Sequence, residues 1–186
     1  MRNEINKMDE LEKSIKSKNR LDVNHQLMML DHSKAEELLS IYSKKYSLCD
    51  EAEIKLFELE NAKDLLKMYI NKYPLCDEAE LKLFELENAE KLQCLYVRKY
   101  SVYSKTEFKL FELKNAEYIL KIYFDKWKLS NEAELKLFEL QNSEDVLMSY
   151  IKKWKLCNEA EVKFFGLNNA KNLQDTYIRR YFSVRK

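Results

Sequence analysis

The sequence predicts an all-α fold, a right-handed α-solenoid of six two-helix repeats. Three observations support this: one glycine and one proline among 186 residues, a 35% charged and 46% hydrophobic composition, and a 27-residue segment that recurs without insertion. Glycine and proline are the residues least compatible with helix interiors, so their scarcity favours helix throughout. The single glycine, Gly166, also excludes phosphate-binding loops and dinucleotide fingerprints, which need several glycines.

The repeat is visible as one twelve-residue segment that returns at a constant step. Its copies are EAEIKLFELENA at Glu51, EAELKLFELENA at Glu78, KTEFKLFELKNA at Lys105, EAELKLFELQNS at Glu132 and EAEVKFFGLNNA at Glu159. Because residues 34–50 match residues 61–77, a divergent first unit begins at residue 24. The units start at residues 24, 51, 78, 105, 132 and 159 and form one continuous domain over 24–186. We expect residues 1–23 to form a polar N-terminal capping helix, with Met8, Leu11 and Ile15 at helical spacing.

Each unit is predicted to contain two helices. The first covers about residues 51–59 in the second unit, where Asp50 is an N-cap type and Glu53 follows three residues later, as in a capping box. Asp77, Asn131 and Asn158 repeat that arrangement. The second helix opens at Asn61 and ends near Tyr73, with one apolar stripe at helical spacing. The stripe consists of Ala62, Leu65, Leu66, Tyr69, Ile70 and Tyr73.

The first segment of each unit has an alternative interpretation. Ala52, Ile54 and Leu56 alternate with charged residues, as in a half-buried strand, which would give a strand-plus-helix solenoid of the leucine-rich type. β-branched residues are rare in these segments, however, which disfavours strands. Glutamate also precedes lysine by four residues, as in Glu51 and Lys55, the order that stabilises a helix. We therefore favour the helix and keep the strand as the alternative.

The pattern resembles the α-solenoid class that includes HEAT, armadillo and tetratricopeptide arrays. The resemblance covers nearly the whole chain but is one of architecture, because a 27-residue unit is shorter than theirs and their signature residues are absent. Short helix pairs cannot bury their apolar faces alone, so the units must stack. The resemblance implies a binding scaffold.

The candidate partner-binding surface comes from comparing the units with one another. In the second helix and the loop before it, four positions at i, i+4, i+7 and i+11 vary most, and they form one stripe opposite the apolar stripe. An unconstrained solvated face is the plain explanation, whereas a diversified recognition surface is the functional one. The predicted binding residues of this variable stripe are Asp64, Lys67, Lys91, Cys94, Arg98, Tyr118, Lys121, Asp145, Met148 and Lys152. Gln141 and Lys114 occupy the loop position of the same set.

A basic column offers a different function, nucleic-acid binding. One position in every unit is cationic and is followed by an aromatic residue, and aromatic and cationic side chains together suit a groove that follows a phosphate backbone. A cation near a helix C-terminus also stabilises the helix carbonyls without any ligand. The column consists of Lys45, Lys72, Lys99, Lys126, Lys153 and Arg180, and the tail adds Arg179, Arg185 and Lys186.

The remaining features predict little chemistry. Cys49, Cys76 and Cys157 share one repeat position and are expected to be small buried fillers, whereas Cys94 lies on the variable stripe as an exposed thiol. The only histidines, His25 and His32, lack the ligands that would complete a zinc site. We expect no catalytic residues, no metal and no cofactor.

A net charge of +1 gives no strong uniform field, and no apolar run is long enough for a signal peptide or a membrane helix. The sequence therefore predicts a cytoplasmic, non-enzymatic scaffold for a protein or peptide partner. Nucleic acid is the alternative partner, and no membrane association is expected.

Overall fold

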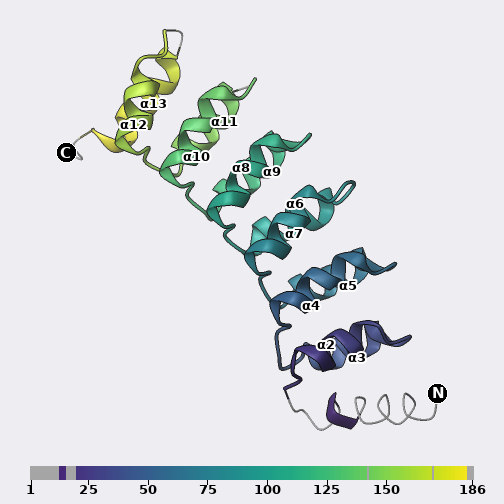
Figure 1. Ribbon diagram of the computed structural model, residues 1–186. Helices are drawn as coiled ribbons and strands as arrows, with labels where there is room; N and C mark the ends of the chain where they lie inside the picture. The colour runs from purple at the N-terminus through teal and green to yellow at the C-terminus, as the bar shows by residue number, and fades with distance from the viewer. Residues whose placement is uncertain (1–12, 16–19, 142, 169, 184–186) are drawn as a thin grey trace. The chain divides into compact units, whose positions relative to one another are not determined.

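The computed structural model describes residues 13–15, 20–141, 143–168 and 170–183 of the chain (Figure 1). These residues form helices joined by turns and short extended segments, and no strand occurs among them. The all-α prediction is therefore confirmed. The strand-plus-helix alternative is wrong for the described residues, because Ala52, Ile54 and Leu56 lie in helical turns.

The chain divides into two compact units, Met1–Leu92 and Gln93–Lys186. The N-terminal unit contains α2 (Val23–Leu30), α3 (Ala35–Tyr42), α4 (Asp50–Lys55) with the 3₁₀ turn η1 (Leu56–Glu58), α5 (Ala62–Ile70) and α6 (Asp77–Glu85). Within it, α2 packs against α4 and α4 against α6, while α3 packs against α5. First helices thus stack on first helices and second helices on second helices.

The C-terminal unit repeats this arrangement. Helix α7 (Glu90–Lys99) crosses the division between the units. It is followed by α8 (Ser104–Glu112), α9 (Ala116–Phe124), α10 (Asn131–Lys136) with η2 (Leu137–Glu139), α11 (Ser143–Ile151), α12 (Asn158–Phe165) and α13 (Lys171–Tyr181). The packed pairs are α8 with α10, α10 with α12, α9 with α11 and α11 with α13. Consecutive helical hairpins therefore lie side by side in this unit, as Figure 1 shows.

Of the capping helix expected over 1–23, residues 13–15 are helical and Ile15 is buried, but residues 20–22 are not helical and Val23 is the first residue of α2. Met8 and Leu11 lie outside the described residues. No helix in the described part of the chain has both the length and the apolar character needed to cross a bilayer.

The core of each unit follows the predicted apolar stripe. Leu65, Leu66, Tyr69 and Ile70 of α5 are fully buried. Each tyrosine equivalent to Tyr69 removes a large aromatic surface, roughly 150–250 Å², from water. The second helix is shorter than predicted, since α5 ends at Ile70 and Tyr73 lies half-buried beyond it. The buried tyrosines of this column are Tyr42, Tyr69, Tyr96, Tyr123, Tyr150 and Tyr177.

The capping-box interpretation of the first helices is wrong. The N-cap of α4 is Cys49 and that of α6 is Cys76, so Asp50 and Asp77 are the first helical residues. The same shift places Ser130 and Cys157, rather than Asn131 and Asn158, at the caps of α10 and α12. In α4 and α10 the glutamate side chain bonds to the cap residue of the next first helix and not to its own cap.

These glutamates are instead buried and join neighbouring hairpins. The Glu53 side chain accepts a hydrogen bond from the Tyr69 hydroxyl at 2.6 Å on Oε1 and from the Cys76 backbone N–H at 2.5 Å on Oε2. Glu134 accepts the same pair of bonds from Tyr150 and Cys157, both at 2.6 Å. We call this arrangement the glutamate bridge. It satisfies a buried hydroxyl and an orphan N–H at a helix start with one carboxylate.

Other bonds complete the bridge. The Tyr69 hydroxyl accepts from the Leu48 N–H at 3.0 Å, and the Tyr177 hydroxyl accepts from the Leu156 N–H at 2.9 Å. Each tyrosine therefore donates to the glutamate of its own hairpin and accepts from the connection that leads into that hairpin. The bonds that the glutamate carboxylate accepts are charge-assisted, and such bonds are among the strongest in proteins.

Burial governs the titration of these groups. Burial raises the pKa of Glu53, against the opposing effect of the hydrogen bonds from Tyr69 and Cys76. Burial also raises the pKa of the Tyr69 and Tyr150 hydroxyls, and the nearby carboxylate raises it further. Both hydroxyls therefore remain protonated donors at neutral pH.

Candidate functional site

Most of the variable stripe lies on the surface. In the N-terminal unit Asp64, Lys67 and Lys91 are exposed. In the C-terminal unit Lys121 and Met148 are half-buried, and the exposed members are Arg98, Tyr118, Asp145 and Lys152. The prediction of an exposed thiol at Cys94 is wrong, because this residue is buried, with 8% of its surface accessible. The side chain at this position of α7 turns into the protein and cannot present a thiol to a partner.

A groove in the C-terminal unit brings several of these variable positions together. It has a volume of about 510 Å³ and is lined by the end of α8, the loop from α8 to α9, the first turns of α9, and the next loop at Leu140 and Gln141. The groove therefore opens between the tips of two successive hairpins. Lys114, Tyr118, Lys121 and Gln141 are the variable-stripe and loop positions among its lining residues.

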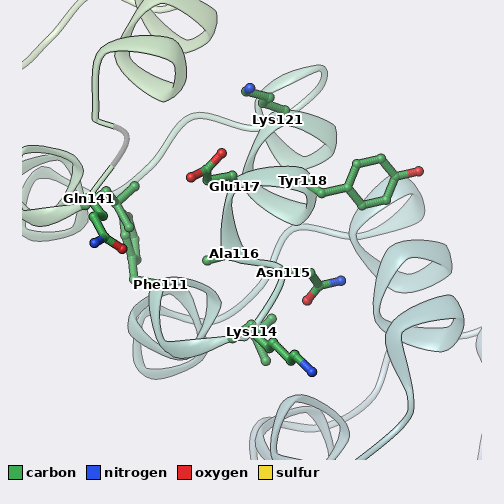
Figure 2. A pocket seen from close by; sticks show the side chains of 10 residues that line it. Phe111, Lys114, Asn115, Ala116, Glu117, Tyr118, Lys121 and Gln141 are labelled. Carbon is green, nitrogen blue, oxygen red and sulfur yellow. The ribbon is translucent and has the colours of Figure 1, made fainter.

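The rest of the lining is apolar. Phe111 and Leu113 contribute from the end of α8 and the following loop, Ala116 from the start of α9, and Leu140 from the next hairpin. Phe111, Leu113 and Leu140 are half-buried, so part of each side chain remains accessible. Figure 2 shows Phe111 and Gln141 on one side of the groove, with Glu117 directed toward that side.

Tyr118 lies at the margin of the groove. Its side chain is 57% exposed and points away from Phe111 and Gln141 (Figure 2). An exposed aromatic ring contributes favourable free energy when a partner removes its apolar surface from water, and tyrosines of this kind are common anchors of interfaces. Lys114 and Lys121 place cationic groups around the same margin, and Glu117 places an anionic one.

Sequence comparison between units could not identify the apolar lining. Phe111, Leu113 and Leu140 belong to the FEL segment, which is identical in four of the six units, so they carry no signal of variation there. Only the loop geometry between hairpins reveals that part of each side chain is accessible. The variable positions Lys114, Tyr118, Lys121 and Gln141 could be identified from the sequence.

A second, smaller groove of about 460 Å³ lies in the N-terminal unit. It is lined by Lys34, Glu36, Glu37, Ser40 and Met68. Glu37 and Ser40 occupy the stripe positions of Asp64 and Lys67 in the first unit, and Met68 is the large apolar side chain in the lining. This groove therefore combines fewer features of a recognition site.

The lysine column is engaged in contacts between hairpins. The Lys126 ammonium donates to the Arg98 carbonyl at 2.7 Å, Lys153 pairs with Asp125, and Lys72 donates to the Ser43 hydroxyl at 3.4 Å. Ser43 and Asp125 are the C-caps of α3 and α9. The cations thus stabilise the end of the preceding second helix, as expected for positive charge at a helix C-terminus.

The other members of the column are exposed. Lys45 lies 5.0 Å from the Tyr46 ring centroid, and Arg180 lies 5.6 Å from that of Tyr181. Lys99 is exposed, as is Arg179 in the last turn of α13. Arg185 and Lys186 lie outside the described residues.

The aromatic residues beside the column have structural partners in two hairpins. The Trp127 indole N–H donates to the Val97 carbonyl at 3.0 Å, and the Trp154 indole N–H donates to the Phe124 carbonyl at 2.9 Å. Each ring thereby satisfies a carbonyl near the end of the preceding second helix. Both rings are half-buried.

The cysteines and histidines form no ligand cluster. Cys49, Cys76 and Cys157 are half-buried free thiols, not the fully buried fillers expected, and burial raises the pKa of Cys76 to about 11. No group of three or more potential metal-ligating side chains occurs in the described residues. His25 is exposed and pairs with Asp22 at 2.8 Å.

No protein-family model, no curated protein and no solved structure matches the chain.

Proposed function

We propose that the chain is a non-enzymatic repeat scaffold of the α-solenoid class that binds a protein or peptide partner. The observation that carries the proposal is the groove of about 510 Å³ at Phe111, Tyr118 and Lys121. It joins an apolar lining to variable positions, which is the combination a repeat binder needs in order to change specificity while keeping its fold.

The groove suits a short peptide segment with one apolar side chain flanked by acidic residues. The apolar side chain would contact Phe111 and Leu140, and the flanking carboxylates would pair with Lys114 and Lys121. Glu117 adds an acceptor for a backbone or side-chain N–H of the peptide. Because both hairpins are ordered before binding, little conformational entropy is lost on the scaffold side.

A random-peptide library panned on the chain provides the ligands for the test. The recovered peptides are then measured by fluorescence anisotropy against the parent and the variant Tyr118→Ala/Lys121→Ala. We expect affinity to fall by about tenfold to a hundredfold, with an unchanged melting temperature, since the tyrosine ring is exposed and the lysine half-buried. A further variant that adds Met148→Ala tests whether the stripe of α11 takes part.

The matched control is Tyr103→Ala/Lys105→Ala. Both residues are exposed, lie in the same unit and are absent from the groove lining. Peptide affinity should stay within about twofold of the parent in this control. Equal affinity for the parent and the groove variant would remove the groove from the proposal.

Nucleic-acid binding along the lysine column remains the alternative proposal and has less support. Lys72, Lys126 and Lys153 already donate to neighbouring hairpins, so phosphate would have to compete with those bonds. The alternative predicts retention of a single-stranded oligonucleotide at low salt and a steep loss of affinity as salt rises. No retention at low salt would exclude it.

A cytoplasmic location is part of the proposal. All four cysteines are free thiols, as in a reducing compartment.

A further inference from the structure

The hairpin α12–α13 carries four exposed large apolar side chains, two of them three residues apart on α12 and two four residues apart at the end of α13. Val162 is 77% exposed, Phe165 43%, Ile178 43% and Phe182 50%. We call these four residues the open face. Contiguous apolar groups held in water are a mark of an interaction surface rather than of a solvated one.

The equivalent positions in preceding hairpins are covered. Ile178 corresponds, at steps of 27 residues, to Ile151 and Phe124, which are 0% and 1% exposed. Ile151 belongs to α11, which packs against α13. Phe124 belongs to α9, which packs against α11. In both cases, the following hairpin lies against the helix that carries the buried residue.

Other positions of the face show the same relation. Phe165 corresponds to Phe138, whose ring lies 5.3 Å from the Lys163 ammonium of the next hairpin. Val162 corresponds to Leu135 of α10, which is half-buried and whose helix packs against α12. Ile178 therefore occupies the position at which α9 and α11 each receive the next hairpin, and Val162 and Phe165 occupy positions that face the next hairpin from α10 and η2. Phe182 has no apolar equivalent, because Lys155 and Lys128 occupy its repeat position.

The glutamate bridge is also altered at this hairpin. Glu161 keeps the Tyr177 hydroxyl at 2.6 Å, but its side chain is 18% exposed, whereas that of Glu134 is 0% exposed. Part of the carboxylate thus reaches solvent beside the apolar residues. The polar and apolar parts of the repeat interface are both accessible here.

We propose that the open face binds the open face of a second copy of this chain, forming a twofold dimer. The proposal extends an interface that already exists between hairpins of this sequence. A twofold contact closes at the dimer, and it uses the same apolar residues on both sides.

The charges of the hairpin fit such a pairing. The first turn of α12 carries Glu159 and Glu161, and the last turn of α13 carries Arg179 and Arg180. Lys155 lies 3.7 Å from Glu161 and 5.0 Å from the Phe182 ring centroid, so the start of α12 is beside the end of α13. A twofold axis parallel to the helices places α12 of one copy on α13 of the other, with acidic turns facing arginines.

Sedimentation of the full chain over a roughly hundredfold range of concentration tests the proposal. The parent should pass from 22.5 kDa to twice that mass as concentration rises. Val162→Lys should weaken dimerisation by at least about tenfold, and Val162→Glu/Ile178→Glu should leave a folded monomer at every concentration. Tyr118→Glu, at an exposed apolar site elsewhere in the unit, should dimerise as the parent does.

Three results would overturn the proposal. The first is a parent that stays monomeric throughout the range. The second is a dimer that Val162→Lys and the double variant leave intact. The third is a series of growing assemblies, which is the signature of a head-to-tail contact. Because the Val162 side chain is 77% exposed, we expect the Val162→Lys variant to fold as the parent does. Its dimerisation can therefore be interpreted without the double variant.

Discussion

The hairpins α2–α3 and α10–α11 use different side chains to bind the backbone N–H at the start of the next hairpin. In α10–α11, Glu134 accepts the Tyr150 hydroxyl and the Cys157 N–H, and every polar partner is satisfied. In the first hairpin Gln26 holds the corresponding position. Its Oε1 accepts the Cys49 N–H at 2.7 Å, but its Nε2 donates to the Leu21 carbonyl at 2.9 Å.

The difference leaves one hydroxyl without an acceptor. The hydroxyl of Tyr42, equivalent to Tyr150, is buried and donates to no acceptor in the described structure; burial raises its pKa, and the nearby Leu21 N–H opposes that rise. An amide offers one acceptor oxygen, whereas a carboxylate offers two. The backbone contact between hairpins therefore survives the exchange of glutamate for glutamine, whereas the tyrosine contact does not.

Removal of the whole carboxylate should have the largest effect. Glu134→Ala leaves the Tyr150 hydroxyl and the Cys157 N–H buried without an acceptor, so we expect a loss of about 3 kcal/mol in the free energy of unfolding. Urea denaturation followed by circular dichroism measures it. Glu132→Ala, two residues earlier in α10 and exposed, should cost no more than about 0.5 kcal/mol. Equal costs for the two substitutions would show that the bridge contributes nothing.

The tyrosine hydroxyls should give the clearest contrast between the two hairpins. Tyr150→Phe removes a donor from Glu134 and should cost about 1–3 kcal/mol, measured as above. Tyr42→Phe removes a hydroxyl that is buried without an acceptor, so stability should stay the same or rise. A large loss in Tyr42→Phe would mean that its hydroxyl has a partner in solution.

The smallest expected effect is a dependence on pH. Because burial raises the pKa of Glu53, the folded chain binds this proton more tightly than the unfolded chain does. Protonation of Glu53 therefore stabilises the folded chain. This contribution to the free energy of unfolding is fully present below the ordinary glutamate pKa of 4.5 and is lost as the pH rises through the raised pKa of Glu53. The stability difference between the parent and Glu53→Gln should therefore shrink from acid to neutral pH. A difference that grows over this interval would contradict the raised pKa.

The sequence predicted the helices, the 27-residue step and the buried stripe, because hydrophobic spacing alone determines which helix face is buried. It did not predict the burial of the glutamates. Glu53 stands among charged residues at a helix start, where capping and solvation are the ordinary roles, and only tertiary packing places Tyr69 and Cys76 around it. The glutamate is the same in five units, but so is the lysine two residues later, so sameness between units did not single it out.

The candidate site was predicted in part. Tyr118 and Lys121 could be identified by their variation between units, but Cys94 at the position of Lys121 is buried. A helical stripe gives the angular position of a residue and not how far a neighbouring hairpin covers it. The apolar lining at Phe111 and Leu140 depends on loop geometry, which the repeat pattern does not encode.

A pair of double-mutant cycles tests whether a carboxylate–tyrosine contact within the hairpin, and not ring burial alone, holds the glutamate that bonds to the next hairpin. The first cycle combines Glu134→Gln with Tyr150→Phe, and the second combines Gln26→Ala with Tyr42→Phe, all followed by urea unfolding. The account predicts a coupling energy of about 1–3 kcal/mol for the first pair and close to zero for the second. Equal coupling energies in the two hairpins would contradict it.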